Sequence, residues 1–367
     1  MLYDHHMEVS PFPHHGPLEP AQAGPQNDLI DDLVRRVTQR RVTALLGPRR
    51  HGKTTALRAV VDRLADSVTA VWLDLYELAS WADLAGRLDR ALVGIGSVGS
   101  PSVTEMAARL GLPLGMLSIE LRKPAPQRPD PLLIVQSQLE ILVTASAHQP
   151  IVLVIDEFSG IVGVDGAAAQ LRTALQHHFQ EIGLLFAGSE PSTMQMLFTD
   201  RAEPFYAQAD LVEAQPFDLV AVERIVRTGF ESTGRHPGSI AASIAQVTDG
   251  HPHRVMELSD AVWSRVAVGS TATENDVILA IDDVLRRESA GLERLFSSLP
   301  TGEQLVLRVL AKNEAVFGGY ADSLGLSSGG AQHARAALID RGYLRRAHRR
   351  VSIVDPVLKE WIRRTFG

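Results

Sequence analysis

The segment Gly47–Thr54, which reads Gly-Pro-Arg-Arg-His-Gly-Lys-Thr, constrains the fold of this chain more than any other feature. The apolar run Val42–Leu46 before it indicates a short buried strand, and apolar residues at helical spacing follow it between Leu57 and Leu64. A glycine loop between a strand and a helix presents backbone N–H groups where phosphate oxygens bind. The pattern therefore predicts a phosphate-binding loop in a parallel sheet with crossover helices.

Each residue type in the loop suits one part of a nucleoside triphosphate. We expect Lys53 to reach the β- and γ-phosphates and the Thr54 hydroxyl to bind Mg²⁺. The residues predicted to bind the nucleotide are Gly47, Pro48, Arg49, Arg50, His51, Gly52, Lys53, Thr54 and Thr55. A glycine turn followed by a surface lysine is the alternative interpretation of the same residues.

A carboxylate pair directly follows the apolar strand Ile151–Ile155. Asp156 supplies the second metal ligand that a bound Mg²⁺ requires, and Glu157 is placed to orient and polarise an attacking water. A structural cap at the end of a strand would explain the pair taken alone. In combination with the glycine loop, the pair predicts hydrolysis of a nucleoside triphosphate.

A further polar residue, Ser189, follows the next predicted strand, Leu184–Ala187. We expect its side chain near the γ-phosphate or the attacking water, although it also suits the N-cap of a helix over Pro191–Phe198. No Asn-Lys-x-Asp motif for guanine occurs, and Asp156 does not begin an Asp-x-x-Gly sequence. ATP is therefore favoured over GTP.

Composition limits the other classes of function. The chain has 367 residues, which predicts two or three domains, and its lack of cysteine excludes disulfides, thiolate zinc sites and a cysteine nucleophile. The net charge of -7 argues against a protein that coats nucleic acid over its whole surface but permits one basic face. No apolar run reaches the length of about eighteen residues that spans a bilayer, so we expect no membrane contact and a cytoplasmic location.

The apolar periodicity predicts four regions along the chain. Residues 1–26 are rich in proline and are expected to be a disordered tail, in which His5-His6 and His14-His15 offer metal ligands without a scaffold. The other three regions are an ATPase domain at 27–216, a helical lid at 217–290 and a winged helix-turn-helix at 291–367. Within the ATPase domain we expect Asn27 as the first N-cap, a fifth strand at Asp210–Ala214 and an insertion at 95–131.

Several tracts resemble the archaeal-type ATPase family, a branch of the STAND class of P-loop NTPases related to AAA+ proteins. The tracts are the loop Gly47–Thr55, Asp156-Glu157-Phe158, Gly188-Ser189 with Met194, Phe198 and Pro204-Phe205-Tyr206, Gln215-Pro216-Phe217, Gly250-His251-Pro252 and the winged-helix end Val354–Trp361. The resemblance covers roughly residues 28–365. It implies a P-loop NTPase sheet followed by a helical lid and a winged helix.

The same resemblance implies functions for single residues. It gives phosphate contact to Lys53, metal binding to Thr54 and Asp156, catalysis to Glu157 and a sensor position to Ser189. In the lid it turns the Gly-x-Pro sequence toward the nucleotide, with Arg254 as a second sensor. Relatives often carry Gly-Arg after Pro-Leu-Tyr, whereas Ala207-Gln208 stands here, so an arginine finger is missing and slow basal hydrolysis is expected. Arg201 is the nearest substitute, although an exposed arginine at a helix end explains it equally simply.

The C-terminal region carries a basic hairpin, with Arg345, Arg346, Arg349 and Arg350. The leading hypothesis is an ATP-driven switch whose winged helix contacts DNA through these arginines, or a protein partner, with oligomerisation that depends on the nucleotide. The alternative is a nucleotide-regulated DNA-binding transcription factor with slow or no hydrolysis. A metabolic kinase is a third hypothesis, against which the Asp156-Glu157 pair argues.

Overall fold

The computed structural model describes residues 9–16, 26–97, 130–347 and 350–367. The chain divides into two compact units, and each is considered by itself. Of the described residues, the sheet unit holds 26–47, 53–97 and 130–214, and the helical unit holds 9–16, 48–52, 215–347 and 350–367. Residues 98–129 of the insertion expected at 95–131 lie outside the described residues.

The sheet unit is built on a five-stranded sheet in the order β2-β3-β4-β1-β5, with every pairing parallel. The strands are β1 (Thr43–Leu46), β2 (Thr69–Asp74), β3 (Ile151–Asp156), β4 (Ile182–Gly188) and β5 (Asp210–Glu213). The expected α/β class and fifth strand are confirmed. Because β4 lies between β1 and β3, the residues that follow these three strands meet at one edge of the sheet.

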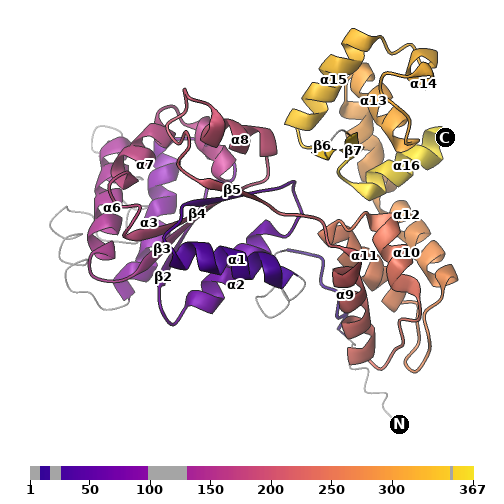
Figure 1. The fold of residues 1–367 in the computed structure, drawn as a ribbon, viewed down its shortest axis with the longest axis horizontal. Coiled ribbons are helices and arrows are strands. Elements are labelled where there is room, and N and C mark those ends of the chain that lie inside the picture. Colours follow the sequence, from indigo (N-terminus) through magenta and orange to yellow (C-terminus); the bar gives the residue numbers. More distant parts are fainter. Residues whose placement is uncertain (1–8, 17–25, 98–129, 348–349) are drawn as a thin grey trace, which may run out of the picture. The chain divides into compact units, whose positions relative to one another are not determined.

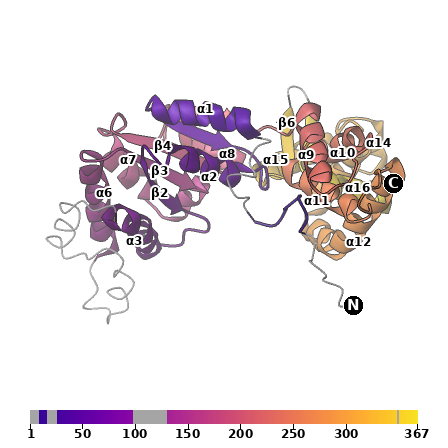
Figure 2. The ribbon, with the colours of Figure 1, turned by 90° about the horizontal axis from the view of Figure 1, so that it is seen from below.

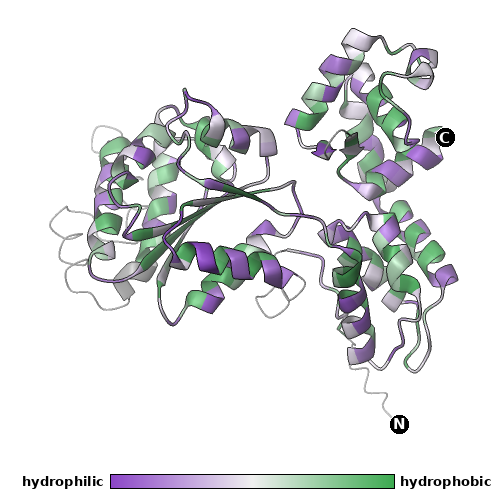
Figure 3. Ribbon diagram, in the orientation of Figure 1, coloured by the Kyte–Doolittle hydropathy of each residue, from purple (hydrophilic) through white to green (hydrophobic). Residues whose placement is uncertain are grey.

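Helices cover both faces of the sheet, which explains why its central strands read as continuous apolar runs. Leu45 packs toward one face and Leu46 toward the other. The first face carries α1 (Asn27–Thr38) and α2 (Lys53–Leu64). The second carries α3 (Trp81–Ser97), α6 (Pro131–Ser146), the 3-10 helix η4 (Phe158–Gly163), α7 (Ala167–Leu175) and α8 (Pro191–Thr199). Figures 1 and 2 show α1 and α3 on opposite sides of the strands, and Figure 3 shows the apolar strands between them.

The helical unit begins with a bundle whose apolar faces form one core. Its helices are α9 (Leu219–Ser232), α10 (Ile240–Thr248), α11 (Pro252–Trp263) and α12 (Glu274–Ser298). Phe12 belongs to this core, with 1% of its surface exposed and its ring centroid 5.7 Å from that of Phe230. The expectation of a disordered tail was therefore wrong for residues 9–16, because one aromatic anchor can order a short proline-rich segment.

The remainder of the helical unit has a second core and a small antiparallel hairpin. Its elements are α13 (Thr301–Ala311), α14 (Gly319–Ser323), α15 (Ser328–Asp340), β6 (Leu344–Ala347), β7 (Arg350–Ile353) and α16 (Pro356–Phe366). Three helices, a hairpin and a last helix follow one another in the order that the sequence predicts, and the winged helix-turn-helix itself stays a prediction. The expected boundary between residues 290 and 291 falls inside α12, because Val277 packs in the first core and Phe296 in the second.

Helix ends agree with the sequence expectations to within a few residues, as is usual for helix boundaries. Asn27 is the first residue of α1 rather than its N-cap, which is Gln26. Among the described residues, no helix combines the length and apolar character needed to cross a membrane.

Candidate nucleotide-binding site

The glycine loop leaves the sheet directly after β1. An added Cβ on Gly47 would lie 3.1 Å from the Cβ of Ala214, the residue after β5, which favours glycine at this position. Gly52 has a φ of 76°, in the left-handed region that glycine adopts at low cost. The helix α2 begins at the next residue, Lys53, so the loop delivers the chain to a helix N-terminus as a phosphate site requires.

Lys53 is a buried cation at this helix start, with 5% of its surface exposed. Its Nζ donates a hydrogen bond to the Gly47 carbonyl oxygen at 2.7 Å, which folds the side chain back across the loop. A buried ammonium beside backbone N–H groups makes this loop strongly attractive to anions. The position therefore suits a contact to phosphate.

Thr54 and Asp156 come together from α2 and β3. The Thr54 hydroxyl donates to Asp156 Oδ2 at 2.8 Å, and the Glu157 N–H donates to Asp156 Oδ1 at 3.0 Å. Burial raises the pKa of the Asp156 carboxyl, an effect that the Thr54 hydrogen bond partly opposes. The Asp156 carboxylate and the Thr54 hydroxyl thus place oxygen atoms side by side. Hard cations prefer oxygen ligands, so these two residues fit Mg²⁺.

Glu157 is held in a fixed orientation by Ser189. The Ser189 N–H and hydroxyl both donate to Glu157 Oε2, at 3.0 and 2.7 Å. Glu157 also has a φ of 50°, a left-handed conformation that costs a non-glycine residue about 1 kcal/mol or more and that concentrates at functional sites. Glu190, not Ser189, is the N-cap of α8, so the serine hydroxyl serves the glutamate rather than a helix end.

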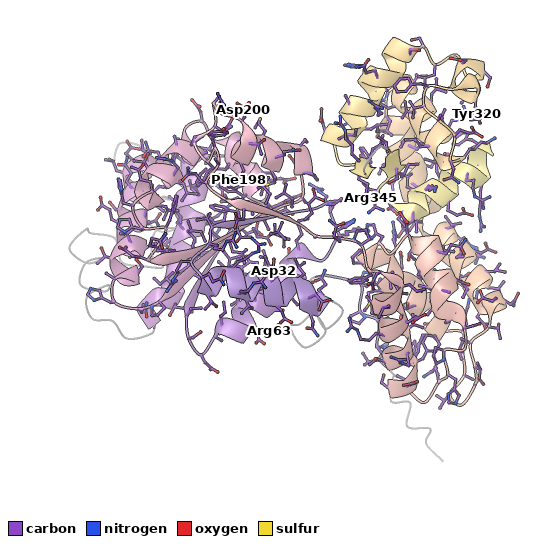
Figure 4. The ribbon with its side chains drawn as sticks, in the orientation of Figure 1. Asp32, Arg63, Phe198, Asp200, Tyr320 and Arg345 are labelled. Carbon is purple, nitrogen blue, oxygen red and sulfur yellow. The ribbon has the colours of Figure 1, made fainter. Side chains whose placement is uncertain are left out.

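An aromatic cluster supports this edge of the sheet. It comprises Phe158, Phe186, Phe198 and Phe205, with ring centroids between 4.6 and 5.9 Å apart. Phe158 directly follows Glu157, and Figure 4 labels Phe198 among the side chains of the sheet unit. Close packing of four rings fixes the backbone from which the Glu157 carboxylate projects.

The structure thus brings together Lys53, Thr54, Asp156, Glu157 and Ser189, which the sequence predicted as catalytic or metal-binding residues. The strand order explains this, because Ser189 directly follows β4, the strand that lies between β1, which leads into the loop, and β3, which leads into the carboxylate pair. No group of three or more histidine, aspartate or glutamate side chains among the described residues could hold a metal by itself. A magnesium ion bound by few protein ligands requires phosphate oxygens and water to complete its coordination.

The structure gives Arg254 different partners from those expected of a nucleotide sensor. Its guanidinium, with a side chain 3% exposed, makes five hydrogen bonds to carboxylates within the helical unit. It is bidentate to Glu288 and to Asp355 and also contacts Glu257 at 2.5 Å. These bonds and charges outweigh the effect of burial and raise the pKa of Arg254. Arg254 therefore joins α11, α12 and the N-terminus of α16.

The Gly250-His251-Pro252 turn before Arg254 has a backbone conformation that requires glycine at its first position. An added Cβ on Gly250 would lie 2.1 Å from the Phe217 carbonyl oxygen, and the residue has a φ of 65°. His251 is 4% exposed, and its ring centroid lies 4.6 Å from that of His51 in the glycine loop. Burial, reinforced by His51, lowers the pKa of His251 to about 3, so the ring is neutral near pH 7. The sequence marks His51 only as a loop residue and carries no signal for this pair.

The basic hairpin is described in part. Arg345 donates to Asp249 Oδ2 at 2.7 Å, and Arg346 on the same strand is exposed. Arg349 and the side chain of Arg350 lie outside the described residues. Arg201 is exposed after α8, and Ala207, in the stretch where the resemblance led us to expect an arginine, has a φ of 54°. A finger function for Arg201 stays a prediction.

Comparison with family models and with curated proteins finds no match. Among solved structures, the Walker-type ATPase PABY2304 of Pyrococcus abyssi is 17% identical, with a TM-score of 0.70 over 96% of this chain and 99% of that chain. The Aeropyrum pernix ORC1 protein in complex with DNA is 14% identical, with a TM-score of 0.46 over 95% of this chain and 93% of that one. The Thermotoga maritima RuvB Holliday junction branch migration motor is 15% identical, with a TM-score of 0.45 over 92% and 94%.

At these identities the similarity concerns the fold. The parallel sheet with flanking helices is that of a P-loop NTPase, as the sequence predicted, and the first of these neighbours matches it over nearly the full length of both chains.

Proposed function

We propose that the chain binds ATP with Mg²⁺ and hydrolyses it, as a switch of the STAND type, which is related to AAA+ proteins. The observation that carries this proposal is the position of the Glu157 carboxylate. Glu157 directly follows Asp156, which pairs with Thr54, and Ser189 holds its carboxylate through two hydrogen bonds. The neighbour from Pyrococcus abyssi, described as a Walker-type ATPase, supports the same chemistry.

Each residue has a defined task in this reaction. Lys53 and the loop N–H groups bind the phosphates, and Thr54 and Asp156 hold Mg²⁺, which withdraws charge from the phosphate oxygens when it is bound. Glu157 orients a water whose oxygen attacks the γ-phosphorus and whose proton passes to the carboxylate, while the bond to the ADP oxygen breaks. Ser189 positions Glu157 through two hydrogen bonds.

Basal turnover is expected to be slow, because Ala207-Gln208 stand where relatives often carry an arginine. An arginine finger contributes a factor of about 10³ or more where it is present. Stimulation would then require a partner or a second copy that supplies the missing charge. This makes the nucleotide state long-lived, which suits a switch better than a metabolic enzyme.

Nucleotide binding is tested by titrating ATP in the presence of Mg²⁺ into the intact chain. Lys53→Ala should abolish binding because it removes the buried cation of the loop, whereas Lys359→Ala on α16 should bind normally. Equal affinities of the two variants would show that the loop does not hold the phosphates. The same titration with Asp156→Asn should lose its dependence on Mg²⁺.

The second candidate function is nucleotide-regulated binding of DNA with slow or no hydrolysis. The hairpin β6–β7, which we call the wing, carries the exposed Arg346 and the half-buried Arg345. The recognition helix α15 offers few side chains for bidentate base contacts, so phosphate contact and weak sequence preference are expected.

Replacement of all four wing arginines, Arg345, Arg346, Arg349 and Arg350, with alanine should lower affinity similarly on unrelated DNA sequences. It should also reduce the slope of log affinity against log salt concentration by about 0.9 for each DNA phosphate that the wing no longer binds. Unchanged affinity in that variant, or no DNA binding by the intact protein at low salt, would favour a protein partner. Turnover measured with and without DNA separates this function from the ATP-driven switch.

A further inference from the structure

The turn Asp249–Pro252 connects α10 to α11 and has little conformational freedom. Asp249 and Gly250 adopt consecutive left-handed conformations, with φ of 48° and 65°. A side chain at Gly250 would collide with the Phe217 carbonyl oxygen, and Pro252 fixes the first turn of α11. A displacement at one end of this turn is therefore carried to the other end.

One end of the turn contacts the wing. The Arg345 guanidinium donates to Asp249 Oδ2 at 2.7 Å and to the Ser352 hydroxyl of the facing strand at 3.3 Å. The Arg345 side chain is 27% exposed, whereas that of Asp249 is 68% exposed. Figure 4 labels Arg345, which lies on β6. The arginine predicted to contact DNA phosphate is therefore paired with a carboxylate.

The other end of the turn contacts the glycine loop, whose residues 48–52 group with the helical unit. His51 and His251 are 2% and 4% exposed, and their rings meet edge to face. The Nδ1 atom of His251 is buried without a hydrogen-bond partner among the described residues. Phosphates bound by the loop would change the surroundings of this ring pair directly, because His51 is part of the loop.

Arg254 fixes the base of the wing. It lies two residues after the turn and bonds to Asp355, the N-cap of α16, which lies two residues after the end of β7. The end of β7 is thus anchored at Asp355, which accepts two hydrogen bonds from the buried Arg254 guanidinium. The other strand of the wing, β6, is contacted by the more exposed Asp249. The exposed contact is the one that can open.

We propose that Asp249 competes with DNA phosphate for Arg345, and that the turn Asp249–Pro252 couples nucleotide binding in the glycine loop to the opening of this contact. This inference rests on the proposed function. Carboxylate and phosphate oxygens bind a guanidinium in the same way, so a phosphate must displace Asp249 to reach Arg345. For a pair this exposed, removal of the competitor should raise DNA affinity about two- to fivefold.

The experiment measures the affinity of the full chain for a random-sequence DNA duplex at low salt. Asp249→Asn should bind about two- to fivefold more tightly than the native chain. Asp322→Asn is the matched control, because it removes the same charge from an exposed position on α14, away from the wing. The gain should disappear when Asp249→Asn is combined with Arg345→Ala. A gain that persists in the double variant, or equals that of the control, overturns the proposal.

Coupling to the nucleotide is measured in the Glu157→Gln background with and without ATP and Mg²⁺. ATP should raise DNA affinity in this background and should have no further effect once Asp249→Asn is added. An undiminished effect of ATP in the presence of Asp249→Asn would overturn the coupling.

Amide hydrogen exchange separates this proposal from DNA binding itself. Without DNA, Asp249→Asn should speed exchange in β6 and β7 relative to Asp322→Asn, and ATP with Mg²⁺ should do the same in the native chain. If no variant binds DNA while exchange changes in this way, the DNA function fails and the coupling stands. Unchanged exchange in both comparisons overturns the coupling whatever the DNA result.

Discussion

Replacing Arg254 with alanine is expected to destabilise the helical unit more than any single surface change. The substitution removes a guanidinium that is 3% exposed and leaves the Glu257, Glu288 and Asp355 side chains, 9%, 27% and 33% exposed, without their countercharge. Removing one partner of a buried ion pair costs about 3–5 kcal/mol. Water can reach Glu288 and Asp355 in part, so we expect the lower end, about 3 kcal/mol. For a unit of this size that lowers Tm by about 6–12 °C.

Thermal unfolding followed by tryptophan fluorescence measures this effect in the helical unit alone. Trp72→Phe and Trp81→Phe in the sheet unit leave Trp263 and Trp361 as reporters. The matched control is Arg265→Ala, which breaks an ion pair to Asp283 whose side chains are 30% and 33% exposed. That change should cost less than about 1 kcal/mol. A Tm for Arg254→Ala within the range of the control would refute the buried network.

The same network predicts a dependence of stability on pH. Burial raises the pKa values of Glu288 and Asp355, but hydrogen bonds from Arg254 outweigh it and hold both below their ordinary 4.5 and 3.8. The stability they contribute is therefore complete above about pH 4.5 and is lost as pH falls through the lowered values. Burial raises the pKa of Glu257, which acts in the opposite direction. Urea titrations between pH 3 and 6 should show a shallower loss in Arg254→Ala, and identical slopes would contradict the assignment.

Two further predictions concern the site and the N-terminal segment. Ser189→Ala should lower kcat by about tenfold or more with little change in KM, because a hydrogen bond to a charged group is worth about 1.5–3 kcal/mol. Ser189→Thr keeps the hydroxyl and should retain most of the rate. Equal rates in the native chain and both variants would show that Ser189 does not position Glu157. Phe12→Ala should destabilise the helical unit by about 3 kcal/mol, because it leaves a cavity where the buried ring packs. Val9→Ala is the control, since Val9 is 85% exposed and its replacement should not change stability. Urea denaturation compares the two variants, and equal midpoints would show that Phe12 does not anchor the segment.

The site could be read from the sequence to the extent that its residues follow strands. The glycine loop, the Asp156-Glu157 pair and Ser189 each come directly after an apolar run, so their place at the sheet edge is a local property. The strand order is not local. Nothing in the periodicity shows that β4 lies between β1 and β3, which is what brings the Ser189 hydroxyl to the Glu157 carboxylate.

The contacts of the helical unit escaped prediction for a different physical reason. Arg254 meets Glu288 and Asp355 across 34 and 101 residues of sequence, and Arg345 meets Asp249 across 96. The sequence alone does not show whether an arginine is exposed to solvent or buried among carboxylates. The pairing depends on which helices pack together, and this is decided by apolar faces that resemble one another in all the helices of the unit.

The steady-state release of phosphate from Mg²⁺-ATP by Glu157→Gln tests the central claim most directly. The native chain should turn over measurably but below about 10 per second, and Glu157→Gln should bind ATP as the native chain does while losing turnover. Glu190→Gln is the matched control, since it neutralises an exposed carboxylate one residue after Ser189 and should hydrolyse at the native rate. Near-native hydrolysis by Glu157→Gln would contradict the account, because Glu157 is the carboxylate that Ser189 holds in place for the attacking water.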